Sequence, residues 1–265
     1  MPHLPSPRQN RLLSAMTGDI QNRIFPYIEL APLPCGKVLY EAGDTMCDVY
    51  FPTDATVALL NKMESGASAG ILMVGNEGLV GAGLVMGENT AYCRAVVLSA
   101  GNAYRLSGQC LKEEFNRHGD LLLLVLLYMQ ALITQMGQVA VCNRHHTTEQ
   151  RFCRWLLMAL DRQQGNMLTA THQLIANTLG VRRESVSDAA AKLQKRGAVT
   201  YGRGHIKVLS RSKLEHLSCE CYAVVKKETD RLLRSAPEKV FDPCRGVDSD
   251  RGIGATPIYQ NARVA

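Results

Sequence analysis

The sequence lacks the segments that would direct the chain to a membrane or out of the cell. Its first residues, Met1 to Pro7, are rich in proline and have no apolar core, so they do not form a secretory signal. The most apolar run, Leu121 to Leu127, is far too short to span a bilayer, and polar residues flank it. We therefore expect a cytoplasmic protein with no membrane partner.

The sequence also lacks a cysteine framework and the motifs of catalysis. Its nine cysteines are odd in number and scattered, and we expect them to be reduced. A Gly-rich phosphate loop, a nucleophile elbow and a paired-carboxylate pattern are all missing from the sequence. We therefore predict that the protein is not an enzyme. Four cysteines are interpreted as small hydrophobic core residues: Cys93, Cys110, Cys142 and Cys153.

Two groups of residues leave a metal site open as an alternative. Cys219 and Cys221 lie close to His216 in the sequence, but a second Cys or His pair at zinc-site spacing is missing around them. His145 and His146 could bind a metal or respond to pH at the end of a predicted helix. We favour cysteines that pack on a helix for the first group and polar linker residues for the second, so no metal is predicted.

The composition is that of a soluble globular chain long enough for two domains. The chain has 265 residues, of which 46% are hydrophobic and 20% are charged. Charge is distributed unevenly along the sequence. Residues 1–143 carry a net charge of −3, residues 144–235 carry +9, and residues 236–265 are balanced. A basic carboxyl-terminal module next to a mildly acidic one indicates a nucleic-acid-binding part joined to a separate regulatory part.

Residues 171–193 are the most informative segment of the sequence. Thr171 can cap a first helix that ends at Gly180, and the apolar residues of that helix share one face. In a second helix Val186, Ala190 and Leu193 recur at i, i+4 and i+7, with charged residues on the opposite face. This pattern predicts a helix-turn-helix whose second helix enters the DNA major groove. An ordinary helical hairpin with a solvated charged face is the alternative.

Short apolar runs separated by turn residues fill residues 37–106. Strands at this spacing predict an antiparallel β-roll or barrel, and a small α/β sheet is disfavoured because no helical pattern fits between the strands. One amphipathic lead-in helix is predicted before the roll, over residues 8–29. The predicted strands cover residues 37–40, 49–51, 56–61, 69–74, 92–97 and 102–106.

A long helix is predicted from Asp120 to Asn143. Apolar residues recur along it every three or four positions as a heptad stripe, and a second apolar face runs beside that stripe. We expect one face to pack on the roll and the other on a second copy of the chain; a single buried core helix is the alternative. The predicted dimerisation residues are Val125, Met129, Leu132, Met136 and Val139.

The predicted fold class is α+β, with four parts in chain order. Behind the helix-turn-helix, residues 197–209 are typical of a β-hairpin wing and residues 211–234 of one amphipathic helix. The parts are a lead-in helix and β-roll (1–118), a dimerisation helix and hinge (119–146), a winged helix-turn-helix (147–222), and a helix end with a disordered tail (223–265).

This order of parts resembles the Crp/Fnr family of bacterial transcription regulators over about residues 10–225. The most specific segments are Leu179–Val186 and the downstream Tyr201-x-Arg203-Gly204-x-Ile206, and 77–81, 93–97 and 214–222 give weaker support. The resemblance implies an effector-sensing antiparallel roll like a cyclic-nucleotide-binding domain, a long dimerisation helix and a winged helix-turn-helix.

The resemblance also implies which residues contact DNA. In such regulators an Arg-Glu pair early in the recognition helix touches base edges, and the matching residues are Arg183 and Glu184. Arg183 can bond guanine at O6 and N7, and Glu184 can accept from the amino group of cytosine. Asp188 stands where the cyclic-AMP receptor protein has a basic residue, so we expect a different operator. Further contacts to bases or phosphates are expected from Thr171, His172, Gln173, Arg182, Ser187, Lys192 and Arg203.

The roll departs from the family members that bind cyclic nucleotide. Gly81 keeps the glycine of their Gly-Glu pair, but Ala82 takes the place of the glutamate, and Asn89 and Thr90 take the places of an Arg-Ser pair. A buried cyclic phosphate would lack its counter-charge, at a cost of roughly several kcal/mol, so we predict no tight cyclic-AMP binding. The first cysteine is Cys35, and no amino-terminal cluster of the kind that holds iron–sulfur groups is found. No cofactor is therefore predicted.

The leading hypothesis is a homodimeric regulator that binds specific double-stranded DNA and senses an unknown small-molecule effector in its roll, with RNA polymerase as a further partner. The alternative is a small-molecule or redox sensor that acts through protein contacts and carries a vestigial DNA-binding domain.

Overall fold

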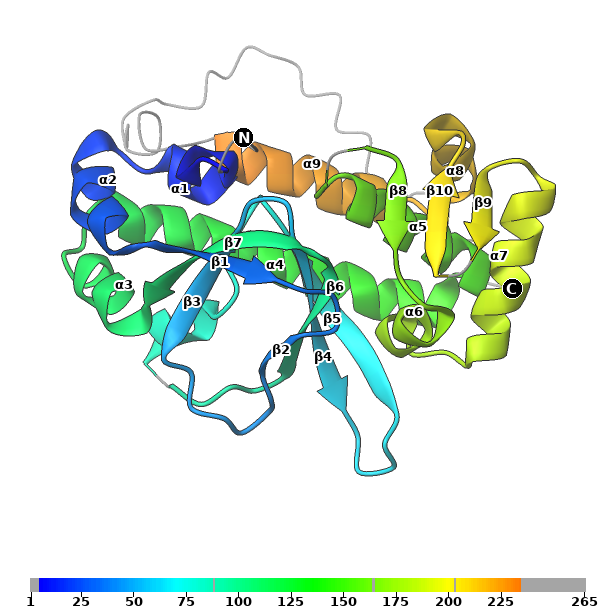
Figure 1. The fold of residues 1–265 in the computed structure, drawn as a ribbon, viewed down its shortest axis with the longest axis horizontal. Helices are drawn as coiled ribbons and strands as arrows, with labels where there is room; N and C mark the ends of the chain where they lie inside the picture. The colour runs from blue at the N-terminus through cyan, green and yellow to red at the C-terminus, as the bar shows by residue number, and fades with distance from the viewer. Residues whose placement is uncertain (1–4, 88, 164, 203, 235–265) are drawn as a thin grey trace, which may run out of the picture.

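The computed structural model describes residues 5–87, 89–163, 165–202 and 204–234. Two parts are arranged along the long helix α4 (Asp120–His145), as Figure 1 shows: a β-roll beside its first half and a winged-helix part beside its end. Helix α9 (Cys221–Arg234) runs back along α4 and packs on it. The predicted α+β architecture, with an antiparallel roll, a long helix and a carboxyl-terminal helix-turn-helix, is confirmed.

The chain before the roll differs from the prediction of one helix over residues 8–29. It forms two short α-helices, because the extended backbone of Met16 ends the first and Thr17 precedes the second. Asn10 fixes the first helix, since its buried side chain accepts a hydrogen bond from the Leu13 N–H and donates to the Pro52 and Gly78 carbonyls. The elements are η1 (Pro7–Gln9), α1 (Arg11–Ala15), α2 (Gly18–Ile24) and η2 (Phe25–Tyr27).

The roll consists of two antiparallel sheets, with strand orders β1-β7-β3 and β2-β6-β4-β5. Strand β1 was not predicted, because Pro32 within it obscures the alternation of apolar and polar residues; it nevertheless pairs in full register with β7, from Glu29 with Arg105 to Leu33 with Gly101. The strands are β1 (Glu29–Leu33), β2 (Val38–Tyr40), β3 (Asp48–Pro52), β4 (Thr56–Lys62), β5 (Ser68–Val74), β6 (Arg94–Ser99) and β7 (Gly101–Ser107), and the helices are η3 (Ala82–Met86) and α3 (Gly108–Phe115).

The inner face of α4 completes the core of the roll. Leu121, Leu124 and Tyr128 are buried there, and the Tyr128 hydroxyl donates a 2.9 Å hydrogen bond to the Leu79 carbonyl. Gly78 is required beside this ring, because a Cβ at that position would lie 2.2 Å from the Tyr128 side chain. The long helix is therefore fixed to the roll by apolar burial and by one buried hydrogen bond.

The winged-helix part combines helices with a three-stranded antiparallel sheet of order β8-β10-β9. The prediction of one helix over residues 211–234 is wrong, because the extended backbone of Ser218 ends α8 and a new helix begins at Cys221. The tail expected after residue 236 lies outside the described residues. The elements are α5 (Thr148–Leu160), β8 (Met167–Thr169), α6 (His172–Leu179), α7 (Arg183–Lys195), β9 (Val199–Gly202), β10 (His205–Val208) and α8 (Arg211–Leu217).

The roll and the winged-helix part are in direct contact. Strand β5 packs on α6 so closely that a Cβ on Gly70 would lie 2.7 Å from the Thr178 carbonyl oxygen. Beside this contact, Arg162 donates from Nε to Oε1 of Glu77 at 2.7 Å, and both side chains are less than one-tenth exposed. A charge pair so deeply buried is costly to break, because the remaining ion would have no partner.

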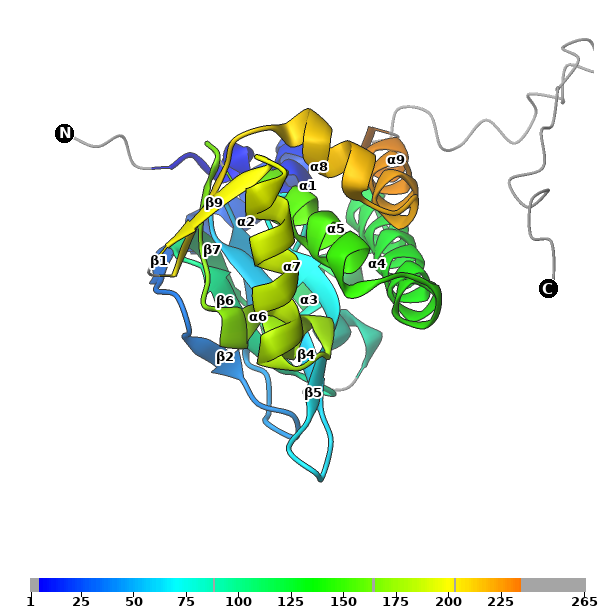
Figure 2. The same cartoon turned by 90° about the vertical axis from the view of Figure 1, so that its right-hand side faces the viewer.

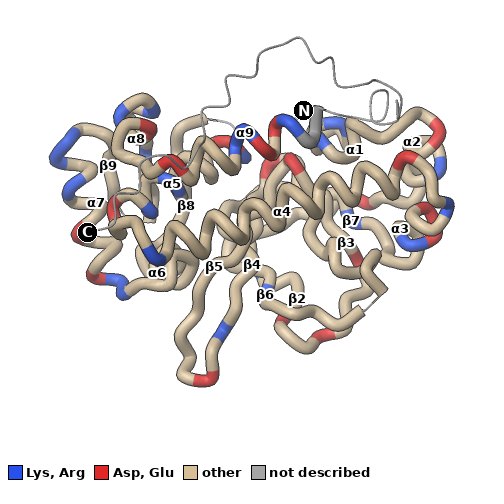
Figure 3. Tube along the Cα trace, turned by 180° about the vertical axis from the view of Figure 1, so that it is seen from behind, with Lys and Arg blue, Asp and Glu red and all other residues tan. Residues whose placement is uncertain are grey.

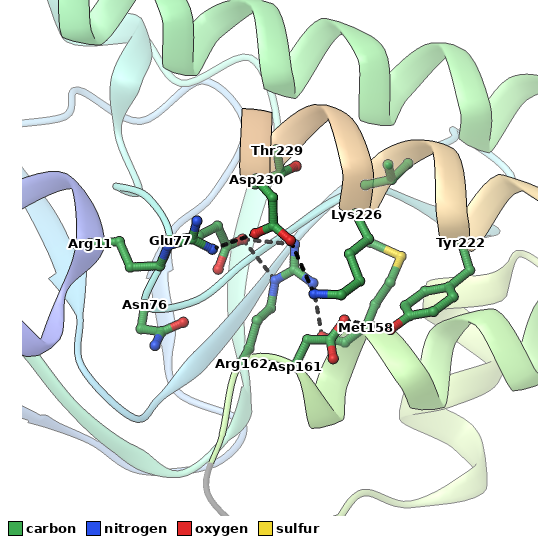
Figure 4. Close-up of a pocket in the computed structure, with 11 residues that line it drawn as sticks. Arg11, Asn76, Glu77, Met158, Asp161, Arg162, Tyr222, Lys226, Thr229 and Asp230 are labelled. Carbon is green, nitrogen blue, oxygen red and sulfur yellow. Dashed lines mark hydrogen bonds and ion pairs between the residues drawn. The ribbon is translucent and has the colours of Figure 1, made fainter. Parts of the chain in front are cut away.

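Polar residues from both parts and from α9 meet at this junction, which Figure 4 shows in close-up. Asp230 on α9 accepts from Arg11 of the lead-in segment at 3.0 Å and from Lys226 at 3.2 Å. Tyr222, also on α9, donates to Asp161 at the end of α5 at 2.8 Å. Helix α9 thereby connects the roll to the winged-helix part.

Candidate nucleic-acid interface

The helix-turn-helix is formed by α6, the turn at Gly180, and α7. The Thr171 hydroxyl accepts a hydrogen bond from the Leu174 N–H at 3.2 Å and caps α6 as predicted. Gly180 ends α6 with φ of +64°, a left-handed backbone that favours glycine, and Val181 N–H then bonds the Ala176 carbonyl at 3.1 Å. The inward face of α7 is buried through Val186, Ala189, Ala190 and Leu193.

The outward face of α7 is polar and lies at one end of the molecule, facing the viewer in Figure 2. Arg182, Arg183 and Lys192 are exposed there, and within the described ranges none of the three pairs with a carboxylate. Glu184 and Asp188 are exposed on the same helix. Figure 3 shows the Lys and Arg positions gathered along this end of the chain. Cations without an acidic partner on an exposed helix are available to bind phosphate or base edges.

His172 and Ser187 are placed differently from the exposed contact residues. His172 is half-buried, its Nδ1 is 2.9 Å from the Ser187 Oγ, and its ring stacks on Tyr201 at a centroid distance of 4.1 Å. Burial, and then the charge of Arg183, lower the pKa of His172 below its ordinary value. This His172–Ser187–Tyr201 contact connects α6, α7 and the wing. Sequence reasoning used Tyr201 only as part of the wing motif and did not assign it a contact with His172.

The other predicted contact residues lie around the same end of the chain. Thr171 and Gln173 are exposed at the start of α6, where the Gln173 amide donates to Asn177 at 2.8 Å. The wing is present as the hairpin of β9 and β10, paired from Val199 with Val208 to Gly202 with His205. Arg203, expected at the tip of the wing, lies outside the described residues.

A comparison with protein-family models matches residues 150–217 to the Crp-like helix-turn-helix domain. These residues form a Crp-like helix-turn-helix domain. The match covers α5 through α8, which are the elements that position the outward face of α7. A comparison with curated protein sequences found no match.

Three solved structures share the fold over most of this chain. A putative Crp/Fnr regulator from Eubacterium rectale is 16% identical with a TM-score of 0.57, over 78% of this chain and 96% of that one. FixK2 from Bradyrhizobium japonicum is 15% identical with a TM-score of 0.60, over 72% and 98%. The c-di-GMP-responsive global regulator CLP from Xanthomonas campestris is 16% identical with a TM-score of 0.59, over 73% and 100%. The Crp-like domain is therefore attached to a roll and a long helix that share the fold of these structures.

The roll residues that the resemblance aligns with a cyclic-nucleotide pocket are partly buried. Gly81 has φ of +96°. Burial raises the pKa of the nearby Tyr40 hydroxyl above its ordinary value, and the Gly81 backbone opposes this shift in part. Ala82 is buried beside it. Asn89 and Thr90 are exposed, and the Asn89 side-chain oxygen accepts from Lys112 at 2.5 Å. Tyr40 is therefore buried close to Gly81.

The second face of α4 remains apolar and exposed. The predicted dimer stripe is only partly on this face, because Val125 is 1% exposed in the core of its own chain, whereas Met136 is exposed. Met129, Leu132 and Val139 are half-buried. Leu126, Ile133 and Val141 are also exposed on this helix, at 52%, 64% and 48%. By length and composition alone α4 could also cross a membrane, but its inner face is packed on the roll and on α9.

Proposed function

We propose that the protein is a sequence-specific DNA-binding transcription regulator of the Crp/Fnr type that acts as a homodimer. The observation that carries the proposal is the outward face of α7, where Arg182, Arg183 and Lys192 are exposed without carboxylate partners among the described residues of a Crp-like domain. Recognition helices of this class present their first turns to base edges in the major groove. The net charge of +9 over residues 144–235 supports the same assignment.

The first turn of α7 is where we place base recognition. Arg183 and Glu184 are the first two residues of this helix, and both are exposed. In the major groove Arg183 would bond guanine O6 and N7, and Glu184 would accept from a cytosine amino group. Arg182, Lys192, Thr171 and the start of α6 would contact phosphates, which contribute affinity and orientation. His172 and Ser187 would position α6 against α7 through their mutual hydrogen bond.

We assign the dimer interface to the exposed apolar face of α4. Leu126, Met129, Ile133 and Met136 recur at spacings of 3, 4 and 3, which is the heptad pattern of two helices packed side by side. This proposed stripe contains Leu126 and Ile133 in place of the adjacent Val125 and Leu132, because those two residues face the core of the chain itself. The two-fold axis of such a dimer would relate its two α7 helices. These helices would then read two half-sites about one helical turn of DNA apart.

Regulation is proposed to act through α4, which is packed on the roll at one end and leads into α5 at the other. An effector would shift the protein between two arrangements of the recognition helices by binding one of them more tightly. Tight cyclic-AMP binding is not proposed, because Ala82 and Asn89 supply neither the carboxylate nor the cation.

Selection of bound sequences from a random pool of duplexes tests this function, combined with a mass measurement of the free protein and of the complex. We expect a two-fold-symmetric sequence and two chains per duplex. A sensor that works only through protein contacts would enrich no sequence, and that result would contradict the proposal.

The double variant Leu126→Lys with Ile133→Lys tests the dimer interface. It should be a monomer with much weaker DNA binding. The control is the double variant Met86→Lys with Tyr92→Lys, because these two side chains are 70% and 59% exposed on the roll.

A further inference from the structure

Four potential metal ligands from distant parts of the sequence meet where α4 ends. Cys142 lies in the last turn of α4 and His146 directly follows that helix, while Cys219 and Cys221 flank the junction between α8 and α9. Their ligand atoms all lie within 4.8 Å of one another. The three cysteines are at most 4% exposed and form a cluster apart from the two larger cores.

The spacing of these atoms fits one tetrahedral metal ion. The Sγ atoms of Cys142 and Cys219 are 3.5 Å apart, and the Sγ of Cys221 is 3.6 Å from the Nδ1 of His146. With Zn–S bonds of about 2.3 Å and Zn–N bonds of about 2.0–2.1 Å, tetrahedral ligand atoms are separated by about 3.5–3.8 Å. The side chains therefore need little movement to surround an ion.

His146 is also oriented as a metal-ligating histidine. Its Nδ1 faces the cysteine cluster, and its Nε2 lies 3.3 Å from a carboxylate oxygen of Glu220. A carboxylate that accepts a hydrogen bond from the outer ring N–H fixes the tautomer in which the inner nitrogen is free to bind a metal. Glu220 stands between Cys219 and Cys221 in the sequence, so one short segment supplies two thiols and this partner.

Two buried arginines next to the cluster favour an anionic centre. Arg151 and Arg154 are 8% and 5% exposed. Within the described part of the chain neither forms an ion pair with a carboxylate, and the Nε atom of each has no hydrogen-bond partner. The charge of Arg154 acts on Cys142, and the charge of Arg151 acts on Cys142 and Cys219. Three thiolates, a neutral imidazole and Zn²⁺ carry a net charge of about −1, which would offset a buried cation.

We propose that Cys142, His146, Cys219 and Cys221 form a Cys₃His site for Zn²⁺. A tetrahedral set of thiolates and one imidazole favours Zn²⁺ over cations that prefer oxygen ligands. The ion would join the end of α4 and the hinge residue His146 to the segment between α8 and α9. It would therefore fix the winged-helix part relative to the long helix. This proposal does not depend on DNA binding, because its readout is the metal itself.

The sequence alone did not predict this site because the two halves of the ligand set are far apart along the chain. Sequence reasoning paired Cys219 and Cys221 with His216 and interpreted Cys142 as a core residue. In the structure the partners are instead Cys142 and His146, which the packing of α9 along α4 brings to the two cysteines. His216 is not part of the cluster.

The test measures metal in the full-length chain, purified under reducing conditions without chelators. Elemental analysis should find about one Zn²⁺ per chain. Separate Cys142→Ser, Cys219→Ser and Cys221→Ser variants should each lose most of the zinc. The matched control is Cys153→Ser, because Cys153 is equally buried but lies in the core around α5. Glu220→Gln should keep the fold and weaken zinc binding by about 10–100-fold in a chelator competition.

A second measurement protects the test against variants that fail to fold. The wild-type chain, stripped of metal and titrated with Co²⁺, should show intense visible bands of tetrahedral cobalt and a thiolate-to-metal charge-transfer band. The proposal is overturned if the reduced wild-type chain binds neither zinc nor cobalt. Stoichiometric iron and sulfide would also overturn it. Zinc binding without DNA binding would uphold the site and contradict the proposed function alone.

Discussion

The roll and the winged-helix part differ in what they leave available to a partner. In the roll Arg105 pairs with Glu29 and Asp48, and Arg23 pairs with Glu114. On α7 the exposed Arg183 and Lys192 have no carboxylate partner among the residues described. These arginines of the roll have carboxylate partners, whereas the two named cations of α7 are free to meet a ligand.

The largest expected effect is on the base-reading pair of α7. Arg183→Ala with Glu184→Ala should reduce binding of the selected site to the level of random DNA, a loss of roughly 10³-fold or more. Each bidentate contact contributes about 1–3 kcal/mol of discrimination. Gel-shift or anisotropy titration measures the loss.

The matched control for that pair is Arg105→Ala with Glu29→Ala, which removes the same two charges from the roll. Its DNA affinity should be nearly unchanged. Equal losses from both double variants would show that general charge, and not α7, determines binding. Circular dichroism and the dimer mass should match the wild type for both.

The next largest effect is expected where the two parts meet. Glu77→Leu leaves the Arg162 guanidinium buried without its partner and should cost about 3–5 kcal/mol of unfolding free energy. Adding Arg162→Met should recover a large part of this loss, because no buried charge then remains. Urea unfolding of the two variants and the wild type gives the comparison. A loss near zero for Glu77→Leu would mean that the ion pair does not hold the roll and the winged-helix part together.

A smaller effect concerns pH and the helix-turn-helix. Because the folded pKa of His172 lies below its ordinary value of 6.5, the unfolded chain takes up this proton first as pH falls. Stability from His172 is therefore complete above pH 6.5 and declines as pH falls toward the folded pKa. His172→Asn should remove this part of the pH dependence, whereas His145→Asn, at an exposed position, should retain it. An NMR titration midpoint for His172 at or above 6.5 would contradict this expectation.

The smallest effect is expected from cyclic AMP on the roll. Calorimetry should detect no binding of micromolar strength, because Ala82 and Asn89 replace the groups that hold ribose and phosphate. Micromolar or tighter affinity would show that the roll has kept the nucleotide chemistry, and the contrast between the two parts would then fail.

The sequence was sufficient for features that depend on neighbouring residues. The helix-turn-helix, its Thr171 cap and its Gly180 turn follow from local spacing, and the antiparallel roll follows from repeated turns. The break of the carboxyl-terminal helix at Ser218 was missed because residues 211–234 retain an amphipathic pattern across it. The burial of Val125 and the contact of Cys142 with Cys219 depend on packing between distant segments, which periodicity alone does not specify.

The most direct test of the central claim, that α7 reads DNA sequence, is equilibrium binding of the wild-type chain across a salt series. The duplexes are the selected site and a scrambled version with the same composition. Both affinities should fall steeply with salt as phosphate contacts are screened, and their ratio should stay near 10³ or above. A ratio near one at every salt concentration would contradict the account and favour a protein-contact sensor with a vestigial DNA-binding domain.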